Sequence, residues 1–250
     1  MSNRMRTVGA EAKQPIRERV WTRLERAGVG RFPLPLAGRI PNFVGAEAAA
    51  ARLASLPEWA GASTLKCNPD APQRPVRVRA LREGKRVFVA VPRLRAARPF
   101  LRLDPRRVGG RLAEAASIRG AAALGTPVDP MSVGRVDLIV VGSVAVRPDG
   151  ARVGKGGGYS DLEFGLLAEL GLIDDDTIVA TTVHDLQLVQ TRIPMTAHDV
   201  PVDLIVTPTR VVRVRRRLPR PRGILPDHLS PEQRAAIPVL ADRRAGRRRR

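Results

Sequence analysis

The apolar residues of the chain recur in two patterns, one typical of helices and the other typical of buried strands. Residues 11–27 are predicted to form a helix, because apolar side chains stand at helical spacing between charged ones: Ile16, Val20, Leu24 and Ala27. Glycines follow directly and end this pattern. A second helix is predicted over residues 47–56, where Pro57 stops it, and the proline-rich segment 31–46 is predicted to be a loop.

Short runs of apolar, mostly β-branched residues predict strands. These runs cover residues 76–80, 86–91, 136–141, 177–183 and 202–207. The third run, VDLIVV, is almost wholly apolar, as expected of a strand that is buried on both faces of a sheet. A helical pattern over residues 161–170 separates two of the runs, and a weaker one covers residues 231–241.

The order of strand, loop, helix and strand in the C-terminal half predicts the fold class. It is typical of a three-layer α/β domain, in which helices cover both faces of a mostly parallel, Rossmann-like sheet. We predict one such domain over residues 1–212. From Arg213 onward the chain is rich in arginine and proline, so residues 213–250 are predicted to form a partly disordered tail.

The net charge of the chain indicates which kinds of ligand it attracts. The 250 residues carry a formal net charge of +20, and nearly all of the 44 basic residues are arginine. A field of this sign attracts polyanions such as nucleotides and nucleic acids. The alternative is that the arginines reflect a GC-rich coding sequence and that the tail is simply solvated. Aromatic residues make up only 3% of the chain, which disfavours a surface that stacks single-stranded nucleic acid.

Cysteine content and hydropathy exclude several classes of protein. Cys67 is the only cysteine, so an intrachain disulfide and two-cysteine metal motifs are excluded. No apolar run is long enough to span a membrane, and the polar N-terminus lacks the apolar core of a signal peptide. We therefore expect a cytoplasmic protein with no membrane partner, and we expect it to be a monomer.

A glycine-rich segment, RVGKGGGYSD at 152–161, precedes the predicted helix that begins near Asp161. Its glycines allow backbone amides to approach a phosphate group: Gly154, Gly156, Gly157 and Gly158. Lys155 adds a charge, and the helix start adds the positive end of its dipole. The segment matches neither a Walker A loop nor a dinucleotide-binding motif, so by itself it predicts anion binding. Asp161, taken alone, is more typical of a helix cap than of a magnesium ligand.

Three blocks in order carry a resemblance to a known family: Lys13 and Arg17 on the first predicted helix, the glycine-rich segment, and IPMTAHDVPVDLIVT at 193–207. Together they resemble the 5-formyltetrahydrofolate cyclo-ligases (5,10-methenyltetrahydrofolate synthetases), and most closely the branch of methenyltetrahydrofolate-synthetase-domain-containing proteins. The resemblance implies a fold of the sugar-phosphate-isomerase and CoA-transferase group. It also implies that ATP and Mg²⁺ drive the conversion of 5-formyl- to 5,10-methenyltetrahydrofolate, a reaction of one-carbon metabolism.

The resemblance further implies roles for individual residues. Two cations of the first helix and the glycines would bind the ATP phosphates: Lys13, Arg17, Gly154, Gly156, Gly157 and Gly158. Three residues would act in catalysis, two by neutralising the transferred phosphoryl group and one by closing over nucleotide or pterin: Lys155, Arg152 and Tyr159. Mg²⁺ would be held by Asp161, which also belongs to the nucleotide site, and by Asp199.

The chain departs from the family on the folate side of the site. Ser160 stands where the cyclo-ligases usually carry a second tyrosine, and Thr196 and Ala197 stand where the enzymes commonly carry a glutamate. Two other functions stay open. One is a protein that keeps this fold without the activity and binds nucleotide or RNA through its arginine-rich surface. The other is a transferase or isomerase of the wider fold group, which rests on fold analogy alone.

Overall fold

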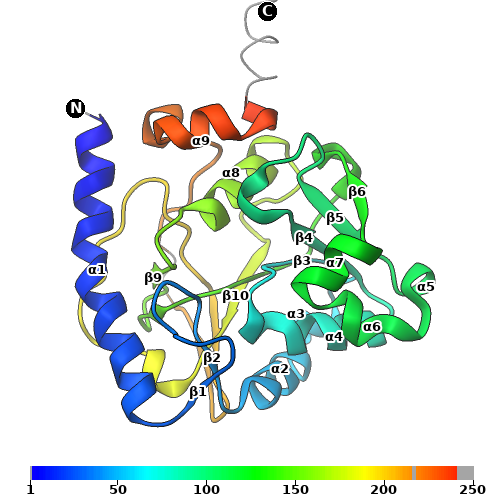
Figure 1. Ribbon diagram of the computed structural model, residues 1–250, viewed down its shortest axis with the longest axis horizontal. Coiled ribbons are helices and arrows are strands. Elements are labelled where there is room, and N and C mark those ends of the chain that lie inside the picture. The colour runs from blue at the N-terminus through cyan, green and yellow to red at the C-terminus, as the bar shows by residue number, and fades with distance from the viewer. Residues whose placement is uncertain (1, 216–217, 241–250) are drawn as a thin grey trace, which may run out of the picture.

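The computed structural model describes residues 2–215 and 218–240. Its centre is an eight-stranded sheet with the strand order β12, β11, β10, β7, β3, β4, β5, β6 (Figure 1). The strands β11, β10, β7, β3 and β4 are parallel, whereas β12 at one edge and β5 and β6 at the other pair antiparallel. The bounds are Thr64–Cys67 (β3), Arg86–Ala90 (β4), Phe100–Leu103 (β5), Thr126–Val128 (β6), Leu138–Val141 (β7), Ile178–Thr182 (β10), Leu204–Val206 (β11) and Val211–Arg213 (β12).

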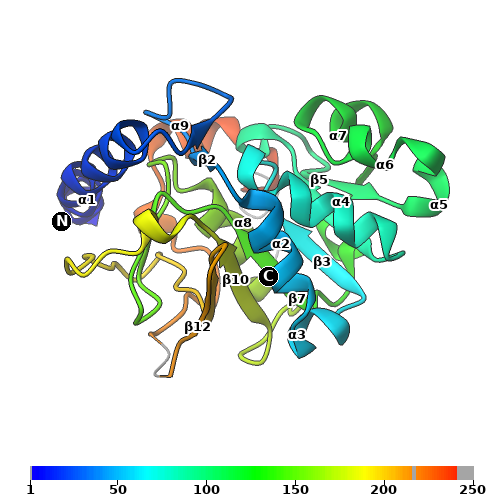
Figure 2. The ribbon, with the colours of Figure 1, turned by 90° about the horizontal axis from the view of Figure 1, so that it is seen from below.

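Side chains of the central strands alternate between two apolar layers. Leu65 and Leu138 pack in one layer with helices α2 and α4, and Phe88 and Ile139 pack in the other with helix α8. This arrangement confirms the predicted three-layer α/β fold, and Figure 2 shows the helices around the sheet from a second direction. The helices are α2 (Ala46–Ala54), α3 (Pro57–Ala60), α4 (Arg74–Arg82), α5 (Pro105–Val108), α6 (Leu112–Ala115), α7 (Ile118–Leu124), α8 (Tyr159–Glu169) and α9 (Pro231–Ala236).

The long helix α1 (Ser2–Arg26) runs along one side of the molecule (Figure 1). Its apolar residues, among them Val20 and Leu24, pack against the small antiparallel pair β8 (Ala145–Val146) and β9 (Arg152–Val153). A second short pair, β1 (Gly30–Arg31) and β2 (Asn42–Phe43), lies in the otherwise irregular segment that follows α1. Because the first two residues of the glycine-rich segment form β9, this packing holds α1 beside the glycines that follow.

The predicted strand over residues 76–80 is wrong, because these residues belong to α4. Arginines alternate with apolar residues in this part of the sequence, which imitates the period of a strand. In the structure Val76, Arg77, Ala80 and Leu81 are buried on one face of the helix. The other predicted strands and the helices α1, α2 and α8 are confirmed, although α1 begins earlier than residue 11 and β7 and β11 are shorter than predicted.

The described part of the segment beyond residue 213 packs against the sheet domain. Arg220 makes an ion pair with Asp203 and donates a hydrogen bond to the Thr177 carbonyl oxygen at 3.0 Å. Ile237, which is 1% exposed, belongs to the same apolar layer as α8. The domain boundary at residue 212 stays a prediction, and residues 241–250 lie outside the described residues. None of the helices within residues 2–215 and 218–240 has the length and apolar character needed to cross a membrane.

Candidate functional site

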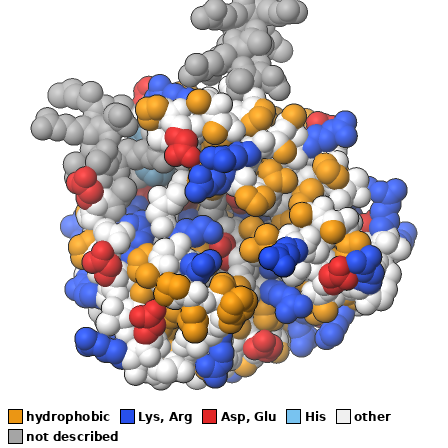
Figure 3. Space-filling view, in the orientation of Figure 1, with side chains coloured by type: hydrophobic (Ala, Val, Ile, Leu, Met, Phe, Trp, Pro, Cys, Tyr) orange, Lys and Arg blue, Asp and Glu red, His pale blue; other side chains and the backbone are white. Residues whose placement is uncertain are grey.

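A cavity of about 670 Å³ opens at the carboxyl ends of the parallel strands. The residues that follow β3, β4 and β7 line it: Asn68, Val91 and Gly142. Ligands of open α/β sheets bind at this edge. Figure 3 shows a hollow near the centre of the visible face, with Lys and Arg side chains on its rim. The cavity is lined by every residue that the sequence predicted for the site: Lys13, Arg17, Arg152, Gly154, Lys155, Gly156, Gly157, Gly158, Tyr159, Asp161 and Asp199.

The glycine-rich loop connects β9 to the start of α8. Gly156 has a φ of 110° and Gly158 a φ of 69°, which are left-handed conformations that residues with a side chain rarely adopt. Gly158 is the N-cap of α8, and it has no side chain with which to cap the first amides of that helix. These amides and the positive end of the helix dipole therefore form a site suited to an anion.

Two cations from α1 lie against this loop. Lys13 is 6% exposed, and its Nζ lies 2.6 Å from both carboxylate oxygens of Asp199. Arg17 is 5% exposed and donates from Nε to the Gly154 carbonyl oxygen at 2.8 Å. Burial lowers the pKa of the Arg17 guanidinium, and the charge of Asp199 acts in the opposite direction. Asp199 thus helps to keep Arg17 charged beside the loop.

Arg152 is a rigid element of the site, because three parts of the chain hold its guanidinium. Its Nη2 lies 2.6 Å from Asp161 Oδ1, its Nη1 donates to the Gly142 carbonyl oxygen at 3.0 Å, and its Nε donates to the Val200 carbonyl oxygen at 3.2 Å. The same Asp161 oxygen accepts a hydrogen bond from the Val200 amide at 3.0 Å. The fixed guanidinium therefore joins β9, the end of β7 and the first turn of α8.

Lys155 is held more loosely. Its Nζ lies 2.8 Å from Asp70 Oδ1, and 48% of its side chain is exposed. Asp70 belongs to the turn that follows β3, so this contact crosses the cavity from the turn to the glycine-rich loop. An ion pair with one exposed partner is easily exchanged. Lys155 is therefore able to move to a bound anion.

The two predicted magnesium ligands are both paired with cations in this structure. Asp199 contacts Lys13 and accepts hydrogen bonds from the amide and hydroxyl of Thr196 at 2.6 and 2.7 Å. Among residues 2–215 and 218–240, no three His, Cys, Asp or Glu side chains gather into a metal-binding group. Mg²⁺ in nucleotide sites is held by one or two carboxylates together with phosphates and waters. Both described hydrogen bonds of Asp161 fall on Oδ1, which fits a role for Oδ2 as such a ligand.

The turn after β3 is a second wall of the cavity that the sequence analysis missed. Asn68 Nδ2 donates to Ser160 Oγ at 3.1 Å, and behind it the buried Lys66 pairs with Glu163 of α8. A polar NPD segment directly after a strand is a signal for a site at the sheet edge. The signal was not usable, because β3 itself was not predicted.

A buried arginine holds the backbone of this turn in place. Arg77 of α4 is 1% exposed and donates to the backbone carbonyl oxygens of Asn68, Pro69 and Asp70, and to that of Ala116 at 2.8 Å. Burial lowers its pKa. A guanidinium has five N–H donors and no acceptor, so it suits a cluster of carbonyl oxygens. Arg77 therefore fixes the backbone that presents Asn68 and Asp70 to the cavity.

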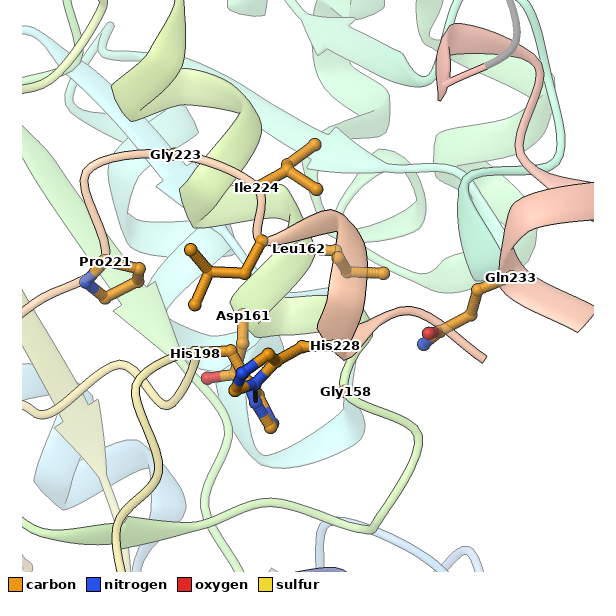
Figure 4. Close-up of a pocket in the computed structure, with 10 residues that line it drawn as sticks. Gly158, Asp161, Leu162, His198, Pro221, Gly223, Ile224, His228 and Gln233 are labelled. Carbon is orange, nitrogen blue, oxygen red and sulfur yellow. Dashed lines mark hydrogen bonds between the residues drawn. The ribbon is translucent and has the colours of Figure 1, made fainter. Parts of the chain in front are cut away.

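Part of the predicted tail reaches the same site. Gln233 of α9 is 3% exposed, and its Nε2 donates to the Gly157 carbonyl oxygen at 3.0 Å. A small adjoining cavity is drawn in Figure 4, where the rings of His198 and His228 lie close together beside Asp161. The Nδ1 atoms of the two histidines are 2.7 Å apart. The C-terminal segment thus contacts both the glycine-rich loop and the 196–199 turn.

Comparison with known proteins gives consistent matches. A sequence model of the 5-formyltetrahydrofolate cyclo-ligase family matches residues 10–208, which confirms the resemblance. Methenyltetrahydrofolate synthase domain-containing proteins are similar over 96% of this chain, with 41% identity in Mus musculus and 38% in Homo sapiens. The chain spans 65% and 63% of the length of these two relatives.

A solved structure supports the fold. The NMR structure of Aquifex aeolicus 5,10-methenyltetrahydrofolate synthetase matches with a TM-score of 0.51 and 24% sequence identity. The match covers 83% of this chain and 96% of that one. At this level of identity, the similarity confirms the architecture of the domain.

Proposed function

The chain belongs to the 5-formyltetrahydrofolate cyclo-ligase family, and we propose on this basis that it is an ATP- and Mg²⁺-dependent 5-formyltetrahydrofolate cyclo-ligase. The observation that carries the proposal is the gathering of four cations around one glycine-rich loop at the start of a helix: Lys13, Arg17, Arg152 and Lys155. Such a site suits a polyphosphate, because backbone amides and fixed cations neutralise it together.

In this proposal the triphosphate of ATP lies on the amides of the loop. Lys13 and Arg17 contact it from α1, and the exposed end of Lys155 leaves Asp70 to reach the terminal phosphate. Arg152 stays in place, since its three contacts fix it. Tyr159, at the mouth of the loop, closes over the bound nucleotide or pterin. Asp161 Oδ2 is the preferred ligand for a Mg²⁺ ion, which would offset negative charge on the phosphate oxygens.

The proposed reaction has two steps. The formyl oxygen of 5-formyltetrahydrofolate attacks the terminal phosphorus of ATP, and ADP leaves. N10 then attacks the formyl carbon and loses its proton to water, and the carbon–oxygen bond breaks as inorganic phosphate departs. Catalysis of this kind rests on the positioning of the two substrates and on charge neutralisation, which fits a site made of cations and backbone donors.

The direct test is the formation of the methenyl product. Protein mixed with Mg-ATP and 5-formyltetrahydrofolate is expected to develop the near-ultraviolet absorbance of 5,10-methenyltetrahydrofolate. Lys155→Ala is expected to lower the rate at least about a hundredfold. Arg106→Ala, which removes an exposed cation of α5, is the matched control and is expected to keep the wild-type rate. If no product forms while ATP still binds, the proposed reaction is wrong.

The charge of +20 supports a second candidate, an RNA-binding protein that keeps the fold. Electrostatic binding of this kind weakens steeply with salt. RNA affinity is then expected to fall when residues 247–250 are removed and when salt is raised. Absent or salt-independent binding would rule out this candidate.

A further inference from the structure

A chain of three polar side chains leads from the buried interior to the wall of the cavity. Lys66 of β3 is 1% exposed, pairs with the carboxylate of Glu163 and donates to Asn68 Oδ1 at 2.8 Å. Asn68 is 6% exposed, and its Nδ2 donates to Ser160 Oγ at 3.1 Å. Asn68 and Ser160 both line the cavity.

The chemistry of these groups fixes the direction of the hydrogen bonds. An ammonium group has three donors and no acceptor, so Lys66 requires that the carbonyl oxygen of Asn68 faces it. The amide nitrogen of Asn68 then faces Ser160, and this nitrogen only donates. The Ser160 oxygen must therefore accept, and its own hydrogen is directed elsewhere. Asn68 Oδ1 is the other acceptor close to it, but at 3.4 Å it is a poor one.

The charge around these three side chains differs from the charge around the glycine-rich loop. Glu163 is 5% exposed, offsets the charge of Lys66 and itself lines the cavity. Because the two opposite charges cancel, this pair adds no net charge that would attract an anion. The Ser160 side of the cavity thus offers a hydrogen-bond donor without net charge, whereas the loop side has four cations against the three carboxylates that pair with them.

We propose that the Ser160 hydroxyl, oriented by Lys66 through Asn68, donates a hydrogen bond to an uncharged carbonyl-type oxygen of the second substrate. Such an oxygen occurs in formamide groups and in cyclic amides. Ser160 is then a specificity-determining residue, and Asn68 and Lys66 are positioning residues that act through it. The inference rests on the proposed function, because it assigns the second substrate to the same cavity as the nucleotide.

Three variants test the direction of the hydrogen bonds between Lys66, Asn68 and Ser160. Ser160→Ala removes the donor and is expected to weaken binding of 5-formyltetrahydrofolate about fivefold to tenfold, the effect of one hydrogen bond. Ser160→Thr keeps the hydroxyl and is expected to stay within about twofold of wild type. N68D keeps Ser160, but the new carboxylate only accepts, so it draws the serine hydrogen toward itself. N68D is therefore expected to weaken binding as much as Ser160→Ala does.

Equilibrium dialysis gives the dissociation constants for 5-formyltetrahydrofolate and, separately, for ATP. The ATP constant is expected to be unchanged in all three variants, which separates recognition from a loss of structure. Ser132→Ala, which alters an exposed serine away from the cavity, is the control.

The double variant S160A/N68D gives a second readout. It is expected to bind the folate no more weakly than either single variant, because both changes remove the same hydrogen bond. Wild-type affinity for the folate in Ser160→Ala or in N68D would overturn the inference. If wild-type protein forms product in that case, the proposed function still stands. If wild-type protein does not bind the folate at all, both proposals fail.

Discussion

The buried ion pair between Lys13 and Asp199 tests how α1 is attached to the sheet domain. Lys13→Met removes an ammonium group that lies 2.6 Å from both carboxylate oxygens, in a pair whose side chains are 8% and 9% exposed. Removing one partner of a buried pair typically costs about 3–5 kcal/mol. Asp199 keeps two hydrogen bonds from Thr196, so we expect the lower value, a loss of about 3 kcal/mol in the free energy of unfolding.

Urea unfolding followed by tryptophan fluorescence measures this loss, since Trp21 is buried on the same helix. Arg19→Met removes an exposed cation of α1 and is the control, with an expected change of at most about 0.5 kcal/mol. Adding Asp199→Asn to Lys13→Met is expected to recover part of the loss, because the buried charge without a partner is gone. A loss below about 1 kcal/mol, or no recovery in the double variant, would refute this reasoning.

The same pair predicts a pH dependence. Burial opposes the ionisation of Asp199, but Lys13 and the hydrogen bonds of Thr196 outweigh burial, so its pKa lies below the ordinary value of 3.8. A carboxyl group with a lowered pKa in the folded state stabilises the fold above its unfolded pKa, and this contribution is lost as the pH falls. The stability difference between wild type and Lys13→Met is thus expected to be full at neutral pH and to shrink below about pH 4. A difference that stays constant to pH 3 would contradict the assignment.

Other contacts lead to three further predictions. Burial lowers the pKa of His198 below 6.5, although the charge of Asp199 acts in the opposite direction. As the pH falls, the unfolded protein therefore binds this proton before the folded protein does, which destabilises the fold. The urea concentration at the midpoint of unfolding is expected to fall between pH 7 and pH 5, and to fall less in His198→Asn. Arg77→Met leaves buried carbonyl oxygens without a donor and is expected to cost about 3 kcal/mol in urea unfolding, whereas the exposed Arg79→Met is expected to cost little. Gln233→Leu removes the donor to the glycine-rich loop and is expected to weaken binding of a fluorescent ATP analogue about fivefold; unchanged affinity would show that α9 does not support the loop.

The sequence predicted those parts of the fold whose signal is local. The strands β7, β10 and β11 are short apolar runs, and α8 follows a cluster of glycines, so each can be recognised without knowledge of its neighbours. The glycine-rich side of the candidate site follows from the same segment. All of its predicted residues line one cavity, because α1 packs on β8 and β9 and so brings Lys13 and Arg17 to the loop.

The parts that were missed depend on contacts between distant residues. β3 has the sequence TLKC, and a lysine in a central strand is tolerated only because Glu163 of α8 pairs with it. Arg77 is similar, since a buried arginine on a helix requires the carbonyl oxygens of the 68–70 turn and of Ala116. No pattern within a short window of sequence contains Glu163 together with Lys66, or Ala116 together with Arg77. The second wall of the cavity could therefore not be predicted with the first.

The acidic partners of the loop cations divide the site into a fixed part and an exchangeable part. Asp199 and Asp161 hold Lys13 and Arg152 in pairs that are largely buried, so both cations are placed before any anion arrives. Because these two cations are already in place, no free energy is spent on ordering them when an anion binds, which is the advantage of a preorganised site. Lys155 is half-exposed, and its pair with Asp70 is weak enough to be exchanged. An anion that enters the cavity therefore meets a rigid frame of cations and one side chain that can follow it, which is the arrangement that the proposed phosphoryl transfer needs.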